Sequence, residues 1–142
     1  MRTSRITAVL GGIAAATLLT VTQASAAGAE TERATETNRP NVQWTKCIAT
    51  HGDNDEYQAC FAPEGDWFMI SDGVSDGSSG VVDWQVGSRY GAIFNADGAS
   101  SQRYKNKNFP ESATVKFRVC KGHWSTKKIT AGTCSGWVSN LA

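Results

Sequence analysis

Two segments of the sequence combine basic and aromatic side chains at short spacing. One spans residues 103–107 with the sequence RYKNK, and the other spans residues 121–128 with the sequence KGHWSTKK. Lysine and arginine can neutralise a phosphate or sulfate backbone, and a neighbouring ring can stack on a base or a sugar. This interpretation assigns binding to Arg103, Tyr104, Lys105, Lys121, His123, Trp124, Lys127 and Lys128. The alternative is a pair of ordinary solvated loops, with Trp124 folded back on the core.

Two aspartates form a weaker candidate site. Asp72 and Asp76, with Gly73 and Ser75 between them, offer carboxylate and carbonyl oxygens of the kind that calcium prefers. Their spacing does not match an EF-hand loop, so a polar turn is the favoured interpretation and no metal is assigned.

Residues that could carry out catalysis are few. The two histidines, His51 and His123, could cleave RNA by acid–base chemistry together with a lysine. No G-x-S-x-G motif is present, and the four cysteines are better used in disulfides. The sequence therefore favours a protein that is not an enzyme and needs no cofactor.

Acidic and basic residues are distributed unevenly along the chain. Residues 27–83 carry eleven acidic and three basic side chains, a balance of −8, whereas residues 84–142 carry two acidic and nine basic ones, a balance of +7. Either strands from the two halves are neighbours and the charges pair, or the molecule has one acidic and one basic face.

The N-terminal residues predict export. Arg2 and Arg5 precede an apolar run, and the small residues at 24–26 form an A-x-A cleavage site, so residues 1–26 are expected to be a signal peptide. Residues 27–41 are polar and lack large apolar side chains, which predicts a disordered leader. Residues 42–142 then form a single secreted, extracellular domain with no membrane span, expected to be monomeric.

Four cysteines in an exported chain predict two disulfides. Of the three possible pairings, Cys47–Cys60 and Cys120–Cys134 are favoured, because each closes a short strand-loop-strand unit. A four-cysteine zinc site is the alternative, but no pair has the short spacing that such sites usually need.

The elements that must position these residues are strands. In residues 113–120, ATVKFRVC, the side chains of Val115, Phe117 and Val119 fall on one side of an extended chain and polar ones on the other. Similar runs recur along the domain, separated by turns rich in Gly, Asp and Ser; one of them, residues 67–70, is apolar on both sides. The pattern predicts an all-β domain, a small antiparallel β-sandwich or barrel of about six to eight short strands.

Five tryptophans are many for a chain of 142 residues. Trp67 and Trp84 occupy positions that face the expected core. Any tryptophan that is exposed offers a stacking surface for a sugar or an anchor for a protein partner.

The pair of cysteines at 47 and 60, the WFMI and SGVVDW runs, and the VKFRVC…CSGW segment resemble small secreted two-disulfide β-proteins of filamentous actinobacteria without assigned activity. The resemblance implies an extracellular all-β domain and transfers no catalytic residue.

The function expected from these observations is a non-catalytic extracellular binding module for polyanions, glycans or the cell envelope. The alternative is a secreted inhibitor of a hydrolase of the protease or amylase type. A small secreted nuclease-like enzyme is third.

Overall fold

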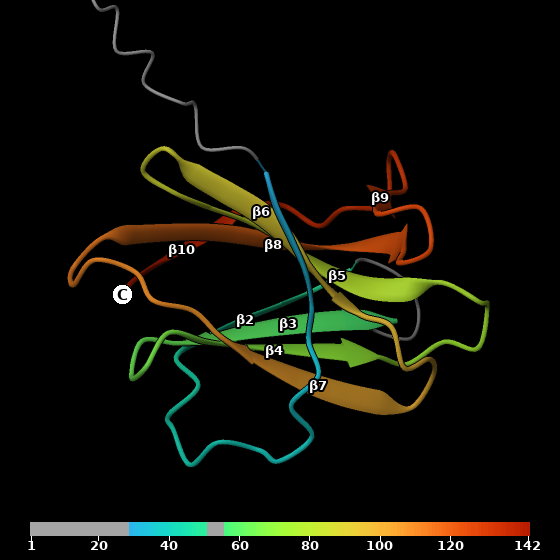
Figure 1. The fold of residues 1–142 in the computed structure, drawn as a ribbon, viewed down its shortest axis with the longest axis horizontal. Helices are drawn as coiled ribbons and strands as arrows, with labels where there is room; N and C mark the ends of the chain where they lie inside the picture. Colours follow the sequence, from blue (N-terminus) through green and yellow to red (C-terminus); the bar gives the residue numbers. More distant parts are fainter. Residues whose placement is uncertain (1–28, 51–55) are drawn as a thin grey trace, which may run out of the picture.

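The protein is a two-layered β-structure, seen edge-on in Figure 1. The computed structural model describes residues 29–50 and 56–142, so the expected signal peptide and His51 lie outside the described residues. Within these ranges the chain forms ten strands and no α-helix, which confirms the all-β prediction. The strands are β1 (Glu30–Arg33), β2 (Lys46–Ala49), β3 (Tyr57–Ala62), β4 (Trp67–Asp72), β5 (Ser79–Val86), β6 (Arg89–Asn95), β7 (Ser101–Asn106), β8 (Thr114–His123), β9 (Lys128–Ile129) and β10 (Val138–Leu141).

The strands form two sheets. Sheet A has the order β1-β6-β5-β8-β10, with β9 paired to β8, and sheet B has the order β2-β3-β4-β7. All strand pairs are antiparallel except β1 with β6, which is parallel. The two-residue turn Gly87-Ser88 joins β5 to β6, with Gly87 at a φ of 57° that glycine adopts without steric cost.

The main core lies between the sheets and is rich in aromatic side chains. As predicted, Val115, Phe117 and Val119 of β8 are fully buried, whereas Lys116 between them is exposed. The ring of Phe117 lies 5.6 Å from that of Phe68 and 6.2 Å from that of Phe61, both in sheet B. The alternation along β8 therefore separates a buried side from a solvent-exposed side.

A second apolar cluster covers the other side of sheet B. Cys60, Met69 and Tyr104 are buried there against Trp44 and Trp67. The prediction that residues 67–70 are covered on both sides is confirmed, because Phe68 and Ile70 belong to the main core. The sequence suggested that Trp67 faces the main core, and this is wrong. Trp67 points to the same side of β4 as Met69, and therefore packs in the second cluster. Trp84 does face the main core, and is fully buried.

Both predicted disulfides are present, Cys47–Cys60 and Cys120–Cys134. Cys47 and Cys60 are directly opposed on the antiparallel pair β2–β3. Each crosslink is expected to stabilise the domain by about 2–4 kcal/mol.

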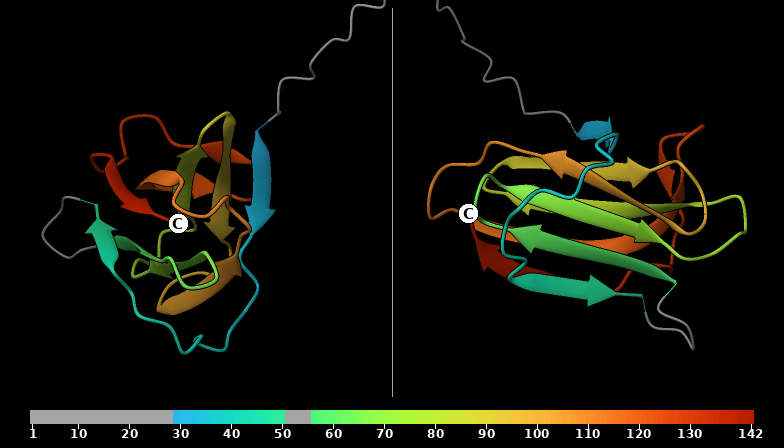
Figure 2. Two further views of the ribbon diagram at one scale, coloured as in Figure 1. Left: turned by 90° about the vertical axis from the view of Figure 1, so that its left-hand side faces the viewer. Right: turned by 90° about the horizontal axis from the view of Figure 1, so that it is seen from below.

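The segment that follows residue 29 is ordered. For this segment, the predicted disordered leader over residues 27–41 and the predicted start of the domain at residue 42 are both wrong. β1 pairs with β6, Ala34 is fully buried, and Glu36 bridges to Tyr104 of β7. Figures 1 and 2 show β1 running along one side of the sandwich, from the layer of β6 towards that of β7. Its composition is too polar to signal burial. The backbone pairing and ion pairs that hold it involve residues far along the chain.

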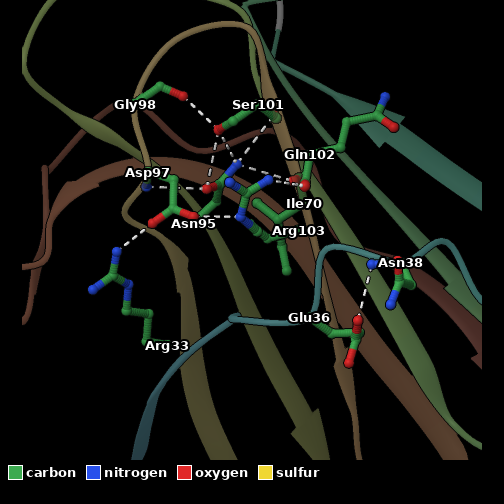
Figure 3. Close-up of polar contacts among 10 residues, drawn as sticks. All are labelled: Arg33, Glu36, Asn38, Ile70, Asn95, Asp97, Gly98, Ser101, Gln102 and Arg103. Atoms are coloured by element: carbon green, nitrogen blue, oxygen red, sulfur yellow. Dashed lines mark hydrogen bonds and ion pairs between the residues drawn. The ribbon is translucent and has the colours of Figure 1, made fainter.

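A buried asparagine joins the two layers close to this side. The Asn95 side chain is fully buried, and its Nδ2 donates to the carbonyl oxygen of Ile70 in sheet B at 3.2 Å. It also donates to the carbonyl oxygen of Ser101, and its Oδ1 accepts from the backbone N–H of Asp97, as Figure 3 shows. The β6–β7 connection is therefore held to both sheets by one side chain.

Replacing Asn95 with alanine is expected to lower the free energy of unfolding by about 2 kcal/mol, because the carbonyl oxygens of Ile70 and Ser101 in sheet B lose their donor. Urea denaturation measures the loss. Asn108→Ala, at an exposed position, is the matched control and should change stability by less than about 0.5 kcal/mol. Equal unfolding midpoints for the two variants would contradict the assignment.

Candidate functional site

Most of the predicted binding residues on β7 already contact other residues of the protein. Tyr104 is only 4% exposed and its ring lies 5.9 Å from that of Trp44, so it cannot stack on a ligand as proposed. The Lys105 ammonium lies 3.2 Å from a Glu32 carboxylate oxygen. Arg103 donates to Asp97. Sequence reasoning missed this because the partners come from β1, the segment after it and the β6–β7 connection.

Lys121 is likewise paired. Its Nζ lies 2.6 Å from Oδ2 of Asp76, and this hydrogen bond lowers the pKa of Asp76 to about 2. Tyr57 also donates to Asp76, and burial, followed by the charges of Asp72 and Asp76, raises the pKa of Tyr57.

The loop with Asp72 and Asp76 is built as a turn. Oδ1 of Asp72 accepts from the backbone N–H of Val74, and Oδ1 of Asp76 accepts from that of Ser78. Asp72 is 1% exposed, and its burial raises its pKa. Within residues 29–50 and 56–142 no group of three or more metal-ligating side chains occurs. The turn interpretation therefore describes this segment.

The charges of the two halves of the sequence pair with each other. Acidic residues from the first half meet basic residues from the second in the ion pairs Glu30–Arg89, Glu30–Lys107, Glu32–Lys105, Glu32–Lys107, Asp76–Lys121 and Asp83–Arg118. Of the two interpretations of the uneven charge distribution, pairing is the one observed.

The second predicted segment forms a turn against sheet A. Trp124 is half-buried and packs on Phe94 with ring centroids 5.7 Å apart, so it is folded back as the alternative interpretation held. The Lys127 ammonium lies 2.7 Å from the centre of the Trp124 ring. Loss of hydration, and then the nearby charge of Arg33, lower the pKa of Lys127. His123 and Lys128 are exposed, and His123 and Trp124 border a shallow pocket of about 260 Å³.

Close to this turn, Asp97 connects β1 with β7. Figure 3 shows the guanidinium groups of Arg33 and Arg103 both directed at the Asp97 carboxylate. Arg33 is in register with Phe94, the residue on which Trp124 packs. Arg103 and the turn around Trp124 thus share one end of the molecule. Two guanidiniums on one carboxylate leave a net positive charge there.

One open surface was not predicted. It is the side of sheet A turned away from sheet B, called here the outer face. Across three strands, Tyr90, Gln85 and Lys116 lie side by side, all exposed. Gln85 and Lys116 also border a shallow pocket of about 210 Å³.

The next row of residues across the strands of the outer face contains Asp83 and Arg118. These two residues form an ion pair beside the indole ring of Trp137. Arg118 donates to Asp83 at 2.8 Å, and its guanidinium carbon lies 4.4 Å from the centre of the Trp137 ring. Trp137 and Tyr90 are each 47% exposed, so part of each ring is accessible to a ligand beside the guanidinium that covers one face of Trp137. The following row holds Arg33 and Phe94, and there the turn with Trp124 and Lys127 covers the sheet.

The alternation in the sequence could have assigned Tyr90, Asp83, Gln85, Lys116 and Arg118 to the non-core side of their strands. The sequence does not indicate that these strands are neighbours. It also does not indicate that this side of them is left uncovered by the rest of the described chain.

Comparison of the chain with protein-family models, curated proteins and solved structures finds no match. Among the described residues, no helix is long and apolar enough to cross a membrane.

Proposed function

We propose that the protein is a non-catalytic extracellular binding module for an anionic polymer, and that the outer face of sheet A is its binding surface. The observation that carries the proposal is the presence of two half-exposed aromatic side chains, Tyr90 and Trp137, beside Lys116 and Arg118 on one open sheet face. Rings of this kind stack on sugars or bases, and the cations attract a charged backbone. Two disulfides are compatible with an extracellular location.

The charge of the outer face supports an anionic rather than a neutral ligand. Lys116 forms no ion pair with any described residue, and Arg33 and Arg103 share a single carboxylate. Lys127 adds a further cation at the same end as Arg33. The residues first assigned to binding contribute through Arg103, Lys127 and, at the border of the adjoining pocket, His123 and Trp124.

Alanine at Tyr90 or at Trp137 is expected to weaken binding by about 1–2 kcal/mol, or roughly 5- to 30-fold, since each ring is open to stacking. The full-length protein with both disulfides formed is titrated calorimetrically with a panel of polyanions at low ionic strength. Both variants should unfold at the same urea concentration as the wild type, because neither ring lies in the main core.

Salt dependence tests the cationic part of the surface. The affinity should fall with salt in proportion to the number of cations that contact the ligand. Lys116→Gln should flatten that dependence, whereas Lys46→Gln, an exposed lysine on sheet B, should leave it unchanged. If no polyanion binds at low ionic strength, the proposal fails, and inhibition of secreted proteases and amylases becomes the activity to assay.

A further inference from the structure

Asp83 places a negative charge in the middle of the outer face. Nε and a terminal nitrogen of Arg118 both lie 2.8 Å from its Oδ2. Among the described residues no donor reaches its Oδ1, and the side chain is 21% exposed. An open carboxylate oxygen accepts a hydrogen bond from a ligand hydroxyl and repels a ligand anion.

Apart from Arg118, which is paired with Asp83, the cations of the outer face stand on either side of this carboxylate. Lys116 lies in the row of Gln85, two residues along β5 from Asp83. Arg33 lies in the row of Phe94 and Val81, two residues from Asp83 in the other direction. At about 3.3 Å per residue, the two rows are separated by roughly 13 Å along the strands.

This spacing discriminates between kinds of polyanion. A nucleic acid strand carries a phosphate on every nucleotide, so a strand that reached both rows would also place a phosphate beside Asp83. A polysaccharide with carboxylates on alternate sugars can direct its charges to the two cationic rows and its hydroxyls to Asp83. The C–H faces of its rings can meanwhile stack on Tyr90 and Trp137.

We infer that the outer face binds an acidic polysaccharide whose carboxylates are separated by neutral sugars, and that Asp83 selects this ligand against nucleic acid. The inference rests on the proposed function and names its ligand class.

The test compares a hyaluronan oligosaccharide, with one carboxylate per disaccharide, and a single-stranded DNA oligonucleotide of similar length. Both are titrated into the full-length protein at the same low ionic strength. The wild type should bind hyaluronan more tightly than DNA. Asp83→Asn keeps the shape and an acceptor for Arg118 but removes the charge, and should strengthen DNA binding by about fivefold.

A second variant keeps the test independent of any effect on folding. Gln85→Glu adds a carboxylate at an exposed position in the row of Lys116, where either ligand places an anionic group, and should weaken DNA binding and hyaluronan binding alike. DNA binding to the wild type as tight as hyaluronan binding, or the same DNA affinity in wild type and Asp83→Asn, would overturn the inference and leave the proposed function standing. Absence of binding to both ligands would also overturn the inference, and absence of binding to every polyanion of the panel would overturn the proposed function itself.

Discussion

Replacing Phe117 with alanine is expected to lower the free energy of unfolding by about 3–5 kcal/mol. Phe117 is fully buried, and its ring contacts Phe61 and Phe68 of the opposite sheet. The loss combines the transfer free energy of the ring with the cost of the cavity it leaves between the layers. Equilibrium urea unfolding, followed by tryptophan fluorescence and by circular dichroism, measures the change.

The matched control is Lys116→Ala, one residue away on the outer face. Its side chain is exposed and forms no ion pair among the described residues, so stability should change by less than about 0.5 kcal/mol. Similar losses from the two variants would mean that β8 does not separate core from solvent. Because Lys116 is also assigned to ligand binding, an unchanged stability makes its binding measurements interpretable.

Removing the two carboxylates of β1 is expected to have the second largest effect. Lys107 is only 5% exposed at its side chain, and its ammonium lies 2.8 Å from Glu30 and 2.5 Å from Glu32. It also lies 4.7 Å from the centre of the Trp84 ring. The double variant Glu30→Gln, Glu32→Gln leaves this buried cation without a counter-charge, which should cost about 3 kcal/mol, at the low end for buried ion pairs because the carboxylates themselves reach solvent.

The same pair predicts how stability depends on pH. The hydrogen bond from Arg89, aided by Lys107, holds the pKa of Glu30 at about 2, below its ordinary 4.5. Burial opposes ionisation of Glu32, but hydrogen bonds from Lys107 and Lys105 outweigh it and lower its pKa as well. A carboxyl whose pKa is lower in the folded state stabilises the fold above its unfolded pKa and loses that contribution as the pH falls.

Wild-type stability should therefore decrease as the pH falls from about 4.5 towards 2, and the double variant should decrease less over the same interval. Urea midpoints at half-unit pH steps provide the comparison. Asp76 and Asp97, whose pKa values are also lowered by basic partners, remain in both proteins, so the difference between the two curves reports β1 alone. Parallel curves would show that β1 is not held by its carboxylates.

Local patterns were sufficient to predict the class of fold, the solvent-exposed and buried sides of β8, and both disulfides. The alternation of Val115, Phe117 and Val119 is a property of consecutive residues in an extended chain, and it assigns each side chain to one side of a sheet. The cysteines of each pair are separated by only 13 and 14 residues, and each pair encloses turn-forming residues. These features need no knowledge of which strands are neighbours.

The order of the strands, and with it the candidate site, followed only from the folded chain. Glu30 meets Arg89 across 59 positions, and Tyr104 is covered by Trp44, so neither the ordered β1 nor the burial of that tyrosine has a local signal. The side of a strand on which Tyr90 lies is set by alternation. Whether that side is open depends on the strands beside it and on what covers them. Hydrogen bonding between distant segments decides which strands are neighbours, and it places the outward residues of β5, β6 and β8 in one surface. The turn around Trp124 covers one end of that surface.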